Sequence, residues 1–124
     1  MNFFKNLLSI NTSNEESSLN WIQLTDESQL DEIAKNSNTS TILIFKHSTR
    51  CGISKSVLRK FEKQLDTSID TELYFLDLIN HRDISNEIAK RFDIVHQSPQ
   101  LLVIKNGVVV EHDSHYDILN MTVS

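Results

Sequence analysis

The sequence predicts an α/β domain in three layers, with a central mixed sheet of about five strands flanked by helices. Short apolar runs rich in β-branched and aromatic residues alternate with segments whose apolar residues recur every three or four positions. The alternation ends in two apolar runs joined by Asn106-Gly107, a dipeptide that favours a tight hairpin. Alternating strands and helices indicate a layered sheet with crossover helices, and the terminal hairpin adds antiparallel strands to it.

The first 20 residues differ in composition from the rest of the chain. A short apolar stripe in the first eight residues is followed by a segment rich in Asn, Ser, Thr and Glu, which cannot bury much apolar surface. The stripe is too short and too weakly basic for a signal peptide. We therefore expect residues 1–20 to form a short, partly flexible extension and residues 21–124 to form the folded domain.

Two strands and two helices are expected in the first half of the domain. Trp21–Leu24 predicts a short strand, and Thr25 or Asp26 can cap a helix with apolar residues at positions 30, 33 and 34. Ile42–Phe45 is a continuous apolar run, typical of a buried central strand. Apolar residues at positions 53, 57, 58, 61 and 65 predict the helix that follows.

The second half continues the alternation and then closes with the hairpin. Leu73–Leu76 predicts a strand, and apolar residues at positions 84, 88 and 92 predict a helix. Leu101–Ile104 and Val108–Val110 are the strands of the hairpin. A short helix at Tyr116–Met121 is expected to close the fold.

Composition excludes several classes of function. The net charge is −5, and no basic run is long enough to indicate a nucleic-acid interface. No apolar stretch approaches the roughly 20 residues that a membrane span needs. Cys51 is the only cysteine, which rules out a disulfide within the chain and fits a reducing compartment. We expect a monomer in the cytoplasm.

Cys51 lies where a strand passes into a helix. Backbone N–H groups in the first turn of a helix have no partner within the helix, and the helix dipole adds positive charge there, so both stabilise a thiolate. Arg50 adds a full positive charge, Ser54 can donate a hydrogen bond to the sulfur, and Gly52 leaves the sulfur uncrowded. The alternative is a buried structural cysteine, but the polar and basic neighbours favour a reactive one.

These residues also carry a resemblance to a known family. Phe45-Lys46-His47-Ser48 followed by Thr49-Arg50-Cys51-Gly52-Ile53-Ser54 resembles the redox-site turn of the thioredoxin superfamily, with serine in place of the second cysteine. More narrowly, it resembles the monothiol bacilliredoxin family of the bacillithiol system. Trp21–Leu24, Ser98-Pro99-Gln100 and Ser114–Ile118 extend the resemblance over nearly the whole domain. It implies a thioredoxin-like fold and thiol–disulfide exchange.

Pro99 is the only proline and comes directly before a predicted strand. A proline at the start of a strand is common, because it has no N–H to offer the ladder. The resemblance implies more: a cis Ser98–Pro99 bond packed against Cys51, with Thr49, Ser98 and Pro99 binding the substrate. The backbone of Ser98 would then pair with an incoming disulfide substrate as a short added strand.

With one sulfur, the predicted reaction is monothiol exchange. Cys51 takes a low-molecular-weight thiol from a mixed disulfide on a client protein, and a second small thiol regenerates it. The resemblance implies that the small thiol is bacillithiol, acting as co-substrate without a resident cofactor. Two alternatives remain. Gly52 makes the site resemble the Cys-Gly-Phe-Ser site of monothiol glutaredoxins, which implies an iron–sulfur cluster carrier, and a redox-inactive adaptor could bind extended peptides at Ser98–Pro99.

The five histidines show no spacing typical of a metal site, and we expect none to be catalytic. His47, four residues before Cys51, is predicted to lie on the loop that leads to the thiol. When protonated there, it could raise the local positive potential.

Overall fold

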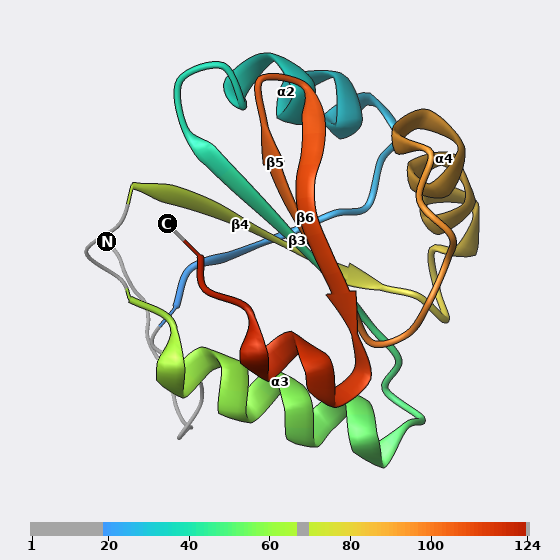
Figure 1. The fold of residues 1–124 in the computed structure, drawn as a ribbon. Helices are drawn as coiled ribbons and strands as arrows, with labels where there is room; N and C mark the ends of the chain where they lie inside the picture. The colour runs from blue at the N-terminus through green and yellow to red at the C-terminus, as the bar shows by residue number, and fades with distance from the viewer. Residues whose placement is uncertain (1–18, 67–69, 124) are drawn as a thin grey trace, which may run out of the picture.

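Five strands form one mixed sheet at the centre of the structure, a computed structural model that describes residues 19–66 and 70–123 (Figure 1). The predicted N-terminal stripe and nearly all of the predicted extension lie outside these residues. The elements are β2 (Trp21–Gln23), α2 (Ser28–Asn36), β3 (Thr41–His47), α3 (Gly52–Gln64), β4 (Thr71–Asp77), α4 (Arg82–Phe92), β5 (Gln100–Lys105), β6 (Val108–Ser114) and the 3-10 helix η2 (His115–Asn120). Figure 1 labels all of these except β2, which is blue, and η2, which is red.

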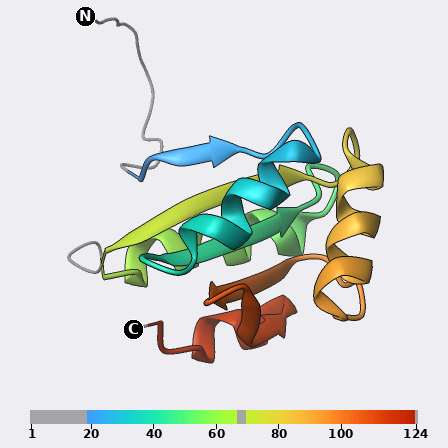
Figure 2. The ribbon, with the colours of Figure 1, turned by 90° about the horizontal axis from the view of Figure 1, so that it is seen from above.

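The strands lie in the order β2-β4-β3-β5-β6. β2, β4 and β3 are parallel, and β5 pairs antiparallel with both β3 and β6. In Figure 2, β2 in blue and β6 in orange-red lie at opposite edges of the sheet. The tight turn between β5 and β6 uses positive φ angles at Asn106 (53°) and Gly107 (78°), as a two-residue hairpin requires. The predicted mixed sheet with a terminal hairpin is confirmed.

Two apolar cores lie on the two faces of this sheet. Ile42 and Ile44 of β3 face one core together with buried residues of α2 and α4. Leu43 and Phe45 face the other core, which α3 and η2 cover. Side chains of a strand alternate between the faces, so β3 is buried on both, as its continuous apolar run predicts.

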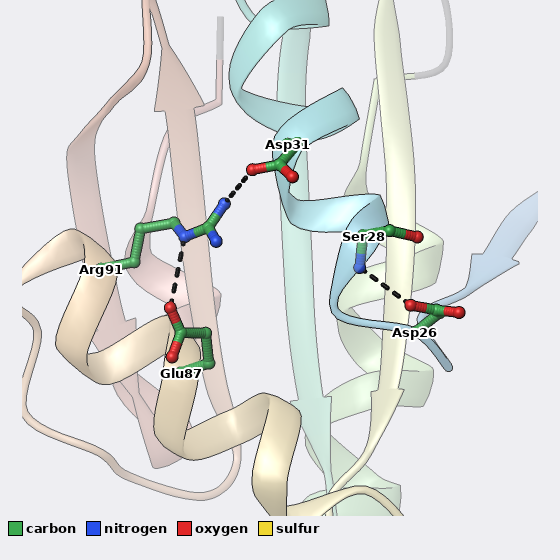
Figure 3. Close-up of polar contacts among 5 residues, drawn as sticks. All are labelled: Asp26, Ser28, Asp31, Glu87 and Arg91. Carbon is green, nitrogen blue, oxygen red and sulfur yellow. Dashed lines mark hydrogen bonds and ion pairs between the residues drawn. The ribbon is translucent and has the colours of Figure 1, made fainter.

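The ends of several elements differ from the predictions. The first helix begins at Ser28, two residues after the predicted cap, and Asp26 Oδ1 accepts the Ser28 backbone N–H at 2.9 Å (Figure 3). Strand β6 extends to Ser114, beyond the apolar run, because edge-strand residues can be polar. The closing helix is a 3-10 helix.

A surface ion-pair network joins the two helices that cover the first core. Arg91 of α4 contacts Asp31 of α2 at 2.8 Å and Glu87 of its own helix at 3.6 Å (Figure 3). Such exposed pairs contribute about 0–1 kcal/mol each, so the apolar contacts between the layers dominate stability. In the part of the chain that the structure describes, no helix combines the length and apolar character needed to cross a bilayer.

Candidate active site

Cys51 is the N-cap residue of α3, directly after the loop that follows β3. Its backbone N–H donates to Ser48 O at 3.1 Å, and its carbonyl oxygen accepts the Lys55 N–H at 3.2 Å. The residue is half-buried, and its side chain makes no capping hydrogen bond. The predicted position at a strand-to-helix corner is confirmed. Cys51 is therefore partly accessible and lies at a helix start, where the backbone N–H groups of the first turn have no partner within the helix.

Gly52, Thr49 and Arg50 flank Cys51 in the sequence. Gly52 is the first residue of α3, and a Cβ added there would meet no atom within 4 Å apart from its chain neighbours. Thr49 and Arg50 are exposed on the loop before the cysteine. Arg50 forms no ion pair with any described carboxylate. Its charge is therefore available to a thiolate or to an anionic substrate.

Ser54 is completely buried, and its hydroxyl has two partners. Its Oγ lies 2.7 Å from His47 Nδ1 and accepts the Ser48 N–H at 3.2 Å. Among the hydrogen bonds of the described residues, none joins Ser54 to Cys51, so the predicted bond to the sulfur is not observed. The Ser54 hydroxyl has one hydrogen to donate. It donates this hydrogen bond to Nδ1 of a neutral His47 ring whose own N–H is at Nε2. Ser54 instead ties the end of β3 to the first turn of α3.

His47 is the last residue of β3 and is 4% exposed. Its ring packs against the rings of Phe75, with centroids 5.2 Å apart, and Phe45, at 6.4 Å. Burial lowers the pKa of His47, with a smaller lowering from Lys55, and this outweighs the opposing charges of Asp77 and Glu62. His47 is therefore neutral near pH 7. The prediction that His47 lies on the loop is wrong, because β3 extends beyond its apolar run and ends at His47.

Lys46 is a buried residue that the sequence reasoning did not single out. Successive side chains of a strand point to opposite faces, so the Lys46 side chain lies on the opposite face of the sheet from that of His47. Lys46 is 0% exposed. Its Nζ lies 3.5 Å from Ser85 O and 3.4 Å from His96 Nδ1. No carboxylate of the described residues forms an ion pair with it. Burial lowers the pKa of Lys46 to about 8.

The Ser98–Pro99 segment lies at the same end of the sheet as the loop that carries Cys51. The Ser98–Pro99 bond is cis, as the resemblance implied. Gln100, the next residue, pairs with Lys46 of β3, and β3 leads into the Cys51 loop only two residues later. Pro99 O accepts the His115 N–H at 3.0 Å, which joins the segment to η2. The structure thus brings the predicted substrate edge and the cysteine loop to one end of β3.

Two buried polar atoms near this edge have no partner among the described residues: Ser98 Oγ and Gln100 Oε1. The amide nitrogen of Gln100 donates to Val95 O at 2.9 Å. In residues 19–66 and 70–123, no group of three or more His, Cys, Asp or Glu side chains is arranged to hold a metal ion.

Comparison with protein families identifies the group to which the site belongs. A model of the family described as Monothiol bacilliredoxin BrxC matches residues 22–123, which include both the Cys51 loop and the Ser98–Pro99 segment. The chain belongs to the monothiol bacilliredoxin family. The resemblance that the sequence motifs indicated is therefore confirmed, and this bacilliredoxin is a thiol redox protein.

Solved structures support the same fold. A protein suggested to be an oxidoreductase with a thioredoxin fold is 31% identical, with a TM-score of 0.69, and the match covers 80% of this chain and 87% of that chain. Thioredoxin from Trypanosoma brucei brucei is 16% identical, with a TM-score of 0.65 and coverage of 86% and 88%. Thioredoxin from Malassezia sympodialis is also 16% identical, with a TM-score of 0.64 and coverage of 86% and 89%. The predicted thioredoxin-like fold of this bacilliredoxin is confirmed.

Proposed function

We propose that this bacilliredoxin removes a low-molecular-weight thiol from mixed disulfides on client proteins. The observation that carries the proposal is the placement of Cys51, the only cysteine, half-buried at the start of α3 in a monothiol bacilliredoxin. A lone thiol there can attack an external disulfide and has no internal thiol to complete the exchange. Membership of the monothiol bacilliredoxin family supports bacillithiol as the small thiol.

The reaction takes two exchange steps. The Cys51 thiolate attacks the sulfur of the small thiol in the mixed disulfide, the bond to the client sulfur breaks, and the client leaves as a thiolate that takes up a proton. A second small thiol, as its thiolate, then attacks the small-thiol sulfur of the adduct, the bond between that sulfur and the Cys51 sulfur breaks, and the small-thiol disulfide leaves. Cys51 returns as a thiolate. The client gains two electrons, and two small-thiol molecules are oxidised to one disulfide.

The residues around the sulfur have separate roles in this proposal. The first turn of α3 and Arg50 stabilise the thiolate both as attacking group and as leaving group. Thr49, Ser98 and Pro99 form the edge along which the client backbone binds. Gly52, the residue after the cysteine, has no side chain that could cover the sulfur. The protein acts as a monomer in the cytoplasm, with the small thiol as co-substrate and no resident cofactor.

The regeneration step gives a direct kinetic test. Protein carrying bacillithiol on Cys51 should lose it at a rate proportional to the concentration of added bacillithiol and should keep it when none is added. Cys51→Ser should acquire no adduct. Loss of the adduct at one fixed rate without added thiol would contradict the mechanism. Cellular phenotypes that are all left intact by Cys51→Ser would favour the redox-inactive adaptor, and visible absorbance after anaerobic reconstitution with iron and sulfide would favour the cluster carrier.

A further inference from the structure

Charge is unevenly distributed along this chain. Positions 50–63 hold five basic residues and one acidic residue, a net charge of +4, within a chain whose net charge is −5. The remainder therefore carries −9. The basic residues form what we call the α3 basic surface, made of Arg50, Lys55, Arg59, Lys60 and Lys63. The helix that begins at the reactive cysteine is thus the cationic part of an otherwise acidic protein.

All five cations are exposed, and none forms an ion pair with a described carboxylate. The one acidic residue of the segment, Glu62, accepts the indole N–H of Trp21 at 2.7 Å on the flank of the helix. Lys60 Nζ lies 6.0 Å from the centroid of the Tyr116 ring of η2. Figure 1 shows α3 as an outer layer of the molecule, beside η2. The charges therefore face solvent without internal neutralisation.

The cations also follow a line along the helix. Lys55, Arg59 and Lys63 are spaced four residues apart and share one face of α3, while Val57 and Phe61 are buried against the sheet. Like charges at this spacing destabilise an isolated helix. The three cations therefore repel one another and destabilise α3. An external anion bound along them would offset this repulsion.

The length of the surface indicates the size of that partner. α3 has 13 residues and is therefore about 20 Å long, from the cysteine end to Lys63. A small thiol at Cys51 reaches only the first turn, near Arg50 and Lys55. A nucleic acid is disfavoured as the partner. Its phosphates extend well beyond the length of one helix, and those beyond α3 would be repelled by the strongly acidic remainder of the protein. An acidic protein surface fits both the length and the charge.

We propose that the α3 basic surface docks an acidic surface of the thiolated client protein and so directs the client disulfide toward Cys51. This inference rests on the proposed function and names its substrate class: clients whose modified cysteine lies beside a cluster of carboxylates. Complementary charge increases the rate of encounter by roughly 10- to 1000-fold at low ionic strength. The effect acts on binding and leaves the exchange chemistry unchanged.

Two peptides that carry the same bacillithiol mixed disulfide test the proposal. One has a Glu-rich flank long enough to follow α3, and the other has Gln at the same positions. Arg59→Glu/Lys63→Glu reverses charges far from Cys51, and Lys35→Glu/Lys90→Glu makes the same change in net charge on the exposed surfaces of α2 and α4. Exchange rates are measured at low and high salt, and binding is followed in parallel by fluorescence anisotropy.

We expect the unmodified protein to react about 10-fold faster with the Glu peptide at low salt, and the advantage to disappear near 1 M salt. Arg59→Glu/Lys63→Glu should lose the advantage while reacting normally with the Gln peptide, and Lys35→Glu/Lys90→Glu should keep most of it. Equal rates and equal binding for both peptides would overturn the proposal. So would binding of a DNA duplex without preference for the Glu peptide. Preferential binding without any exchange would contradict the proposed function and leave the docking surface supported.

Discussion

Replacing Lys46 by methionine is expected to raise the free energy of unfolding at pH 7 by about 3 kcal/mol. Methionine has a similar length and no charge, and Lys46 is completely buried. Its ammonium has only long contacts with Ser85 and His96, at 3.5 and 3.4 Å. Burial lowers the pKa of Lys46 to about 8 from 10.5, and each pKa unit corresponds to about 1.4 kcal/mol. The substitution removes this penalty and loses little hydrogen bonding.

The gain in the free energy of unfolding from Lys46→Met should depend on pH in a characteristic way. A cation whose pKa is lower in the folded state opposes folding fully below the folded pKa, here below about pH 8. The penalty declines as pH rises toward 10.5 and disappears above it. The gain from Lys46→Met should therefore be largest at pH 7 and much smaller at pH 10.

Urea unfolding at both pH values measures this gain, with Lys35→Met as the control. Lys35 is exposed, so its substitution should change stability by less than about 0.5 kcal/mol at either pH. If Lys46→Met lowers stability at pH 7, the contacts with Ser85 and His96 outweigh the effect of burial. That result would contradict this account of Lys46.

Replacing Ser54 by cysteine is expected to change the reaction from monothiol to dithiol exchange. Cys51 is the N-cap and Ser54 is the third residue of α3, and side chains three residues apart on a helix are neighbours. A sulfur at position 54 can then attack the adduct on Cys51 and release the small thiol without an external one. The variant should form an internal disulfide under oxidation, seen by mass and by thiol titration.

The reduced form of the same variant should be less stable than the natural protein by about 1–3 kcal/mol. The hydroxyl of Ser54 is buried and bonds to His47 Nδ1 and the Ser48 N–H, and a thiol is a weaker partner for both. Ser54→Ala is the matched control: it should lose similar stability and gain no internal route. If Ser54→Cys stays reduced under oxidants that modify Cys51, the proposed turn geometry is wrong.

The sequence was sufficient to predict the strands and helices and their order along the chain. Continuous apolar runs located β3 and β5, and Asn106-Gly107 located the hairpin, because these signals depend on residues close together in the chain. The position of Cys51 at a helix start followed from the same local patterns.

The buried polar residues could not be predicted in the same way. Lys46 and His47 follow an apolar run, which indicates the end of a strand, yet both are buried within β3. Lys46 contacts Ser85 and His96, and His47 contacts Ser54. These partners are distant in the sequence or on the next element, and only the fold brings them close. A local pattern therefore assigned His47 to the loop and the Ser54 hydroxyl to the sulfur.

The most direct test of the central claim is the intact mass of the protein after incubation with a client that carries bacillithiol. We expect the protein to gain the mass of one bacillithiol in disulfide linkage, fragmentation to place it on Cys51, and the client to be recovered as a free thiol. Cys51→Ser should leave both masses unchanged. A protein that stays unmodified while the client keeps its bacillithiol, or that becomes linked to the client itself, would contradict the proposed exchange.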